Sequence, residues 1–439
     1  MKRSSVLIFG FIVYSSVTFG AFYTFQVAIA ADSSRTKKSS GAPPYPVHRQ
    51  REYPTMEDAL KHAPDIKKLN LTDKKGFQLN PNISKFGNMQ FLDISRNELT
   101  DLPPEICQLT NLKIIRATNN KLTELPDCLG NIASLQQLDL SDNRIKSFNL
   151  DFTKSKLMKI IRLTNNSLES LPALFGNIEF LHDVYLDNNK FKAFPEALCN
   201  LKKVSTISLS KNQITQIPAS IGKIKTLKKL TLNDNNLTVL PKEFGGLSSL
   251  LTLELQKNSL TSLPQEFSGL TALEELDLSE NKIKAFPQNI KLYGLKKFEF
   301  VKNKSEVFPS EWDCFPALLK LNLSGNKLKT LPKSFEQLKS LYQLDLTGNH
   351  FISLPVEITS LKELRVLILD KNQLTFLPGD IYKLQNLYFL SLSHNRISKL
   401  SDEIKNLKNL NTLTLTGNHI SRAELERIIK LIPNTKVIF

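Results

Sequence analysis

The chain has 439 residues, a length that normally corresponds to two or three domains. Lysine and arginine exceed aspartate and glutamate by 16, which favours anionic partners or simply gives a solvated, soluble surface. The four cysteines include no C-x-x-C pair and no zinc-site spacing, which argues against a cysteine-bound metal.

Residues 1–30 have the pattern of an export signal. Lys2 and Arg3 form a basic start, residues 6–13 are apolar, and residues 28–30 form a small-residue cleavage site. We therefore expect a secreted, periplasmic or cell-surface protein. The uncharged stretch 4–31 is also long enough for an uncleaved membrane anchor, and this alternative stays open.

Residues 31–54 are polar, basic and proline-bearing, which predicts a flexible linker. Thr55, with Asp58 three residues later, resembles the start of a capped helix. The sequence therefore predicts a helix over residues 55–63, as part of an N-terminal cap at residues 55–65.

One pattern repeats through residues 66–420. Its landmark is an asparagine that recurs every 23 residues, with one step of 22, at Asn97, Asn120, Asn143, Asn166, Asn189, Asn212, Asn235, Asn258, Asn281, Asn303, Asn326, Asn349, Asn372, Asn395 and Asn418. Apolar residues keep fixed offsets from it, such as Leu253, Leu255 and Leu260 around Asn258. A period of this length predicts stacked units, because one unit cannot bury its own apolar face.

Each part of the unit has a structural explanation. The alternating L-x-L segment predicts a short strand with one buried and one solvent-facing side. The asparagine follows where the chain leaves the strand, and its amide can bond to main-chain groups of its own and the adjoining turn. Twelve units continue with Leu-Pro, Phe-Pro or Ile-Pro, and proline opposes continuation of the strand.

These units read L-x-x-L-P-x-x-I/F-x-x-L-x-x-L-x-x-L-x-L-S-x-N, and residues 66–439 resemble bacterial leucine-rich repeat proteins. The resemblance implies an α/β solenoid, a horseshoe with a parallel concave sheet, about 16 turns and helical caps at both ends. It does not identify a ligand, because the same scaffold serves many partners. The array leaves no room for a separate catalytic domain, so we expect no enzyme.

Residues 421–439 are expected to form the C-terminal cap. Ser421 and Glu424 have the spacing of a capping box, from which a helix would extend to about Leu431. Val437 and Phe439 alternate as in a last strand and would cover the exposed end of the core.

Three turns depart from the pattern. Lys74 takes the asparagine position of a degenerate first turn, and Ser155 and Ser305 stand where other turns have core residues. The departures indicate either a kink or binding loop, or local drift that large side chains such as Trp312 and Phe315 absorb.

The cysteines all follow the proline position, on the convex or connecting side. Cys107 and Cys128 lie in adjoining turns and can pair, although their spacing does not require it. Cys199 and Cys314 are five turns apart and are expected to be free thiols.

The residues six, four and two positions before each asparagine should line the concave face, and most are small or polar. Val366, Ile368 and Phe389 are exceptions in two neighbouring turns, and such apolar clusters are typical interface anchors. Alternatively, they shield the C-terminal turns or meet another copy of the chain.

A second candidate group contains Ile114, Arg116, Ile160, Arg162 and Tyr185. Asp139 falls between the two arginines, so an internal row of ion pairs is the alternative interpretation. A third group is charged and predicts either a docking site or a self-neutralised surface: Glu254, Glu275, Asp277, Glu280 and Glu299, with Lys297, Lys302, Lys304 and Lys320.

Signals for catalysis and metal binding are weak. Asp277 and Glu299 lack a companion nucleophile or oxyanion loop. His350, His394 and His419 lie near Asp370, but only the last two histidines belong to adjoining turns. We expect no catalytic residue, metal or cofactor.

The favoured hypothesis is a non-enzymatic solenoid, exported by a bacterium, that binds a protein or anionic glycan through its concave face in adhesion or host interaction. The alternative is a membrane-anchored envelope structural protein held against anionic lipid or polysaccharide. Specific binding of nucleic acid is not expected, and the sequence indicates no oligomeric state.

Overall fold

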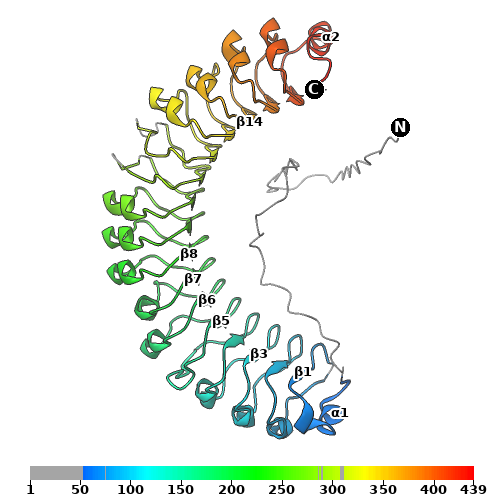
Figure 1. Cartoon of the computed structure of the whole chain (residues 1–439), viewed down its shortest axis with the longest axis vertical. Coiled ribbons are helices and arrows are strands. Elements are labelled where there is room, and N and C mark those ends of the chain that lie inside the picture. Colours follow the sequence, from blue (N-terminus) through cyan, green and yellow to red (C-terminus); the bar gives the residue numbers. More distant parts are fainter. Residues whose placement is uncertain (1–52, 75, 285, 288–289, 307–310) are drawn as a thin grey trace, which may run out of the picture. The chain divides into compact units, whose positions relative to one another are not determined.

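The computed structural model describes residues 53–74, 76–284, 286–287, 290–306 and 311–439. Within these ranges, seventeen short strands form one sheet, in which each strand pairs in parallel with the next from β1 to β17. The strands lie along the inner side of the curved array and the connecting segments along its outer side (Figure 1). The predicted leucine-rich repeat solenoid with a parallel concave sheet is confirmed. The predicted signal at residues 1–30 and nearly all of the predicted linker lie outside the described residues.

Every strand has three residues, of which the middle one is an apolar residue that points into the core. The register keeps these residues in one row, as Leu92 pairs with Ile115 and Leu230 with Leu253. The strands are β1 Lys68–Asn70, β2 Phe91–Asp93, β3 Ile114–Arg116, β4 Gln137–Asp139, β5 Ile160–Arg162, β6 Asp183–Tyr185, β7 Thr206–Ser208, β8 Lys229–Thr231, β9 Thr252–Glu254, β10 Glu275–Asp277, β11 Lys297–Glu299, β12 Lys320–Asn322, β13 Gln343–Asp345, β14 Val366–Ile368, β15 Phe389–Ser391, β16 Thr412–Thr414 and β17 Lys436–Ile438.

Short 3-10 helices form most of the outer side. Most of these helices begin directly after the proline. The proline is the N-cap residue and has an extended conformation. They are η1 Ala63–Asp65, η2 Pro81–Lys85, η3 Pro104–Gln108, η4 Asp127–Asn131, η5 Ala173–Asn177, η6 Glu196–Asn200, η7 Ala219–Lys223, η8 Lys242–Gly246, η9 Gln265–Gly269, η10 Lys333–Gln337, η11 Val356–Ser360, η12 Gly379–Lys383 and η13 Asp402–Asn406.

The N-terminal helix is shorter than the sequence predicts. Helix α1 spans Met56–Leu60, and Thr55 is its N-cap, accepting a hydrogen bond from the amide of Asp58. The helix ends at Leu60, and the chain continues into the 3-10 helix η1, which has Pro64 in its first turn. Tyr53, placed in the linker by the sequence analysis, is buried against the core of the array.

The repeated asparagines connect neighbouring turns as predicted. Asn258 Nδ2 donates to the carbonyl oxygens of Leu255 in its own turn and Leu232 in the preceding turn, at 3.0 and 2.9 Å. Its Oδ1 accepts from the amide of Leu237 at 3.0 Å. The same three contacts recur along most of the array. At Asn97 the Oδ1 accepts from the amide of Lys74, and at Asn303 the Nδ2 donates to Leu278 and Val301. Each amide therefore satisfies main-chain groups that no strand or helix pairs.

The residue directly before each asparagine has a positive φ, which turns the chain sharply out of the strand. Three of these residues are glycines, Gly325, Gly348 and Gly417, and asparagine or aspartate fills several others. These residue types tolerate the left-handed region best, although lysine and arginine also occur there.

The irregular turns keep a filled core. The buried hydroxyl of Ser155 lies 2.7 Å from the carbonyl oxygens of Gly130 and Ile132, and it can donate its one proton to either of them. Trp312 is fully buried, with its ring 5.5 and 5.0 Å from those of Phe315 and Phe335. These contacts support the interpretation that large side chains absorb local drift.

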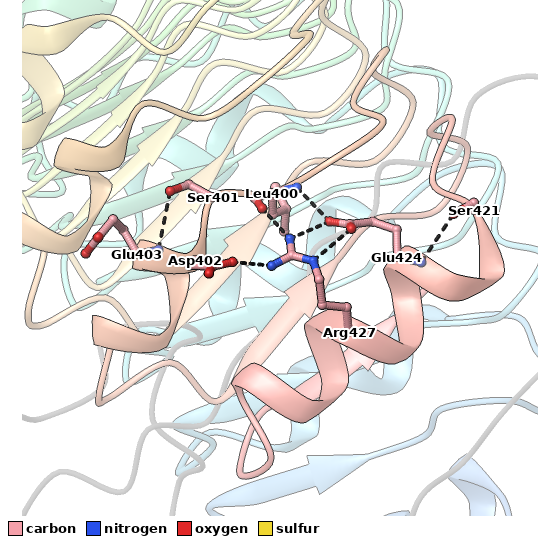
Figure 2. A network of polar contacts seen from close by, with 7 residues as sticks. All are labelled: Leu400, Ser401, Asp402, Glu403, Ser421, Glu424 and Arg427. Carbon is pink, nitrogen blue, oxygen red and sulfur yellow. Dashed lines mark hydrogen bonds and ion pairs between the residues drawn. The ribbon is translucent and has the colours of Figure 1, made fainter.

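Helix α2, Arg422–Leu431, is tied to the preceding turn by a polar network (Figure 2). Ser421 caps the helix by accepting from the amide of Glu424 at 3.2 Å. The carboxylate of Glu424 instead accepts from the amide of Leu400 at 3.0 Å and from Arg427, so the predicted capping box is only half formed. Hydrogen bonds from Arg427 hold the pKa of Glu424 below its usual range. Arg427 also contacts Asp402 of η13.

The last strand differs from expectation at its end. Val437 packs against the core, but β17 ends at Ile438, and Phe439 is 69% exposed and does not cover it. The expectation for Phe439 was therefore wrong, because its position falls beyond the pairing of β17 with β16.

Cys107 and Cys128 form a disulfide with Cα atoms 5.8 Å apart, which resolves the pairing that the sequence left open. Cys199 and Cys314 are buried free thiols, as predicted, and burial raises the pKa of Cys314 to about 12. Within the described part of the chain, no helix is long and apolar enough to cross a membrane.

We predict that Asn258→Ala destabilises the array by about 1–3 kcal/mol, because it leaves buried main-chain groups without partners. Urea unfolding followed by circular dichroism would measure the change. The matched control is Asn236→Ala in the preceding turn, where the asparagine is exposed and a change within about 0.5 kcal/mol is expected. Equal effects of the two substitutions would contradict a structural role for the repeated asparagines.

Candidate binding surface

The concave face is formed by the residues six, four and two positions before each asparagine. Many of its polar side chains bind the backbone of the array. Asp93 accepts from the amide of Ser95 at 3.1 Å, Asp345 from Thr347 at 2.9 Å, and Asp370 from Ser393 in the next turn at 2.7 Å. These carboxylates cap amides that the strands leave unpaired, so part of the polar character of this face is structural.

The predicted apolar patch lies on β14 and β15. Val366 pairs directly with Phe389 in the sheet, so the three residues are neighbours as expected. Ile368 and Phe389 are half-buried, whereas Val366 is only 9% exposed. Ile368 and Phe389 therefore provide most of the exposed area of this patch, and Val366 adds little.

Both arginines of the second candidate group lie over aromatic rings. The Cζ atom of Arg116 lies 5.4 Å from the centre of the Phe91 ring, and that of Arg162 lies 4.9 Å from the centre of the Tyr185 ring. Asp139, between them, accepts from the amide and hydroxyl of Ser141. Cation–π contacts therefore hold both guanidinium groups on the concave face.

Two apolar side chains lie on the same strands as the two arginines. Ile114 and Ile160 flank Gln137 in the sheet and are both partly exposed. Phe91 completes the row beside Ile114, and the sequence analysis missed it. The sequence could have identified Phe91, because it is an aromatic residue six positions before Asn97, and the equivalent residues of the other turns are mostly polar.

The acidic group is partly neutralised by neighbouring lysines. Glu254, Asp277 and Glu299 occupy one row on β9, β10 and β11. Lys229 lies 3.0 Å from Glu254, and Lys297 lies 3.5 Å from Glu299. Burial raises the pKa values of Asp277 and Glu299, and Lys297 opposes this effect in both. The arrangement is that of a self-neutralised surface.

Three histidines lie near the edge where the strands end, and all three are exposed. They are His350, His394 and His419, and His350 Nδ1 lies 3.5 Å from Gln373 Nε2. Among the described residues, no three His, Cys, Asp or Glu side chains are grouped closely enough to hold a metal ion.

A second apolar cluster lies off the concave face, where the chain runs from the asparagine towards the outer side. Ile352 is 63% and Phe376 is 52% exposed, and Phe376 forms an isolated bridge with Ser353. Val356, at the start of η11, is also exposed. The sequence analysis missed this cluster, although other turns carry threonine, lysine or glutamate at the position of Ile352.

Comparison with known families identifies the fold class. Residues 225–283, 301–351 and 362–420 match a model described as leucine rich repeat, and residues 57–160 match one described as leucine-rich repeat region. The structure of a leucine-rich repeat protein of Leptospira interrogans is 33% identical, covers 89% of this chain and 100% of its own length, and superposes with a TM-score of 0.71. The chain therefore belongs to the leucine-rich repeat family.

Other similar structures include a plant receptor ectodomain and a domain of a bacterial protein. The leucine-rich repeat ectodomain of the Arabidopsis thaliana receptor kinase GASSHO1/SCHENGEN3 is 27% identical, with a TM-score of 0.67. The match covers 84% of this chain and 46% of that one. The functional domain of InlJ from Listeria monocytogenes, at 21% identity, 82% and 74% coverage and a TM-score of 0.63, shows the shared fold alone. No curated protein matches the chain.

We predict that Asp277→Asn raises the melting temperature at pH 7. Burial places the pKa of Asp277 above its ordinary value of 3.8, so the carboxylate contributes progressively less stability as pH rises from 3.8 through the folded-state pKa. Asparagine keeps an acceptor for the amide of Ser279 and removes the charge. The advantage of the variant should shrink as pH falls and Asp277 takes up its proton.

Thermal melts between pH 4 and pH 7 would measure this difference. Glu98→Gln is the control, because the side chain of Glu98 is 77% exposed. A lower melting temperature for Asp277→Asn at pH 7 would show that the negative charge itself stabilises the sheet.

Proposed function

We propose that the protein is a non-enzymatic binding solenoid that holds a protein partner on its concave face. The observation that carries this proposal is a contrast within that face. Many polar side chains are occupied by the backbone, whereas Ile368, Phe389, Ile114 and Ile160 remain partly exposed in a mostly polar surface. Apolar and aromatic side chains in such settings are the usual anchors of protein interfaces.

The two ends of the array offer different chemistry. The patch on β14 and β15 is apolar, whereas the group on β2 to β6 adds two arginines held over aromatic rings. Arginine and tyrosine are enriched among the residues that dominate interface energies. A partner with apolar residues near one end and carboxylates near the other would match both groups.

The related structures support the binding role. The GASSHO1/SCHENGEN3 ectodomain was determined in complex with Casparian strip integrity factor 2, a ligand of that receptor. The similar Leptospira interrogans protein supports a bacterial source, and the export pattern of residues 1–30 supports a role outside the cytoplasm. We propose adhesion or host interaction as that role. An anionic glycan is the alternative ligand class, favoured by the net charge of +16.

Photo-crosslinking from the concave face would identify the partner. A crosslinking amino acid at Thr412, whose backbone pairs with Phe389, should capture it, whereas the same group at exposed Val239 off the concave face should not. With the partner purified, Phe389→Ala should weaken binding by about 1–2 kcal/mol or more, because it removes an aromatic anchor. Isothermal titration calorimetry would measure the change.

Val239→Ala is the matched control, since it also removes an exposed apolar side chain but lies off the concave face. It should leave the affinity unchanged. Full affinity after combined replacement of Ile368 and Phe389 would eliminate the apolar patch as the binding site, and the arginine group would become the next target.

Export makes a separate prediction. The mass of the mature N-terminus, measured on secreted or surface-accessible material, should correspond to a start at Ala31. An intact Met1 in the membrane fraction would instead favour the second candidate, an anchored envelope protein, because residues 4–31 are uncharged and long enough to span a bilayer.

A further inference from the structure

The positive charge of the array is concentrated along one edge. This asparagine edge is defined by the residues one before, one after and three after each repeated asparagine. Across the fifteen turns these positions hold sixteen lysines or arginines and six aspartates or glutamates, a net charge of +10. Residues 55–439 as a whole hold 51 basic and 40 acidic residues, a net charge of +11. The remaining residues together therefore carry a net charge of only 11 − 10 = +1.

The charge is densest in three consecutive turns around Asn281, Asn303 and Asn326. Six lysines occupy the edge there, all exposed, at Lys282, Lys284, Lys302, Lys304, Lys327 and Lys329. Adjacent strands are about 4.8 Å apart, so this lysine cluster extends over roughly 10 Å along the edge.

The irregular turn contributes to the cluster. The step from Asn281 to Asn303 is one residue short, and both Lys302 and Lys304 have positive φ values of 54° and 61°. Lys327 lies 3.5 Å from Glu306, but both side chains are about half exposed or more, so this ion pair contributes little and can exchange with a ligand. The remaining acidic edge residue, Glu280, precedes Asn281.

We propose that this lysine cluster binds a linear acidic polysaccharide, one that carries carboxylate or sulfate groups along its chain. Lysine is a compact charge on a flexible stem and accepts anions without a fixed geometry. A row of such charges fits a polymer that runs along the edge from turn to turn. The site is separate from the concave face and does not depend on the proposed function.

Two observations favour a polysaccharide over other polyanions. Single-stranded nucleic acid is bound through aromatic side chains that stack with bases, and the described edge positions of these three turns carry no aromatic residue. An anionic membrane surface is usually bound by apolar side chains together with basic ones, and these edge positions carry no apolar residue.

The test uses the full chain and a fluorescein-labelled heparin dodecasaccharide, with affinity measured by anisotropy from 50 to 200 mM NaCl. Binding should weaken steeply with salt, as charge-driven association does. Replacing all six cluster lysines by glutamine should weaken binding about tenfold or more at 50 mM NaCl and reduce the salt dependence. A second variant with only Lys282, Lys304 and Lys327 replaced should give an intermediate loss.

The control variant removes the same charge from the outer side, at six exposed lysines: Lys202, Lys203, Lys223, Lys242, Lys333 and Lys339. It should change the affinity less than about threefold. Equal losses in the two six-lysine variants would show that only net charge matters and would overturn the proposal. No heparin binding, or equally tight binding of a single-stranded dT20 oligonucleotide with the same variant pattern, would overturn it as well.

Discussion

The whole array depends on the repeated asparagine, whose side chain forms hydrogen bonds with its own turn and with the preceding turn. An asparagine amide has donors and an acceptor on opposite sides, so it can bond to its own turn and to the preceding one. Asn258 does this within a buried environment, where an unpaired amide or carbonyl group costs about 1–3 kcal/mol. The cost applies to every turn, so a turn without its neighbour is unstable and the turns must stack.

This constraint explains how the array tolerates a missing residue. At the 22-residue step, the side chain of Asn303 keeps its contact with the preceding turn by donating to the carbonyl oxygen of Leu278. Its backbone N–H donates to Asn326 Oδ1. The hydrogen bonds of the repeated asparagines therefore continue through the short turn, with altered partners. The aromatic cluster around Trp312 fills the core beside it. The turn changes its shape on the edge without breaking the sheet.

The repeated features were predictable because identical physics acts in every turn. Strand positions, buried asparagines and the turn at the proline follow from a period that fifteen copies make visible. The ends were less predictable. Glu424 has the spacing of a capping box, but its carboxylate binds the amide of Leu400 and the guanidinium of Arg427, and only the packed structure shows this outcome.

The candidate surfaces were predictable as columns but not as exposed areas. The sequence places Val366 beside Phe389, yet it cannot show that Val366 is nearly buried there. It also places Arg116 beside Asp139, but it does not show that the guanidinium lies over Phe91 in the neighbouring strand on the other side. In both cases the direction of a side chain decides the result, and periodicity does not encode direction across turns.

The division of the surface into distinct chemistries follows from the same geometry. Each turn sends one set of side chains to the concave face and another to the asparagine edge, and neither set takes part in the core. A turn contacts only its neighbours, so a substitution on one surface disturbs the fold locally. Substitutions of the apolar residues on the concave face and of the lysines on the edge can therefore occur independently of each other. A partner protein on one surface and a polyanion on the other would not compete for the same side chains.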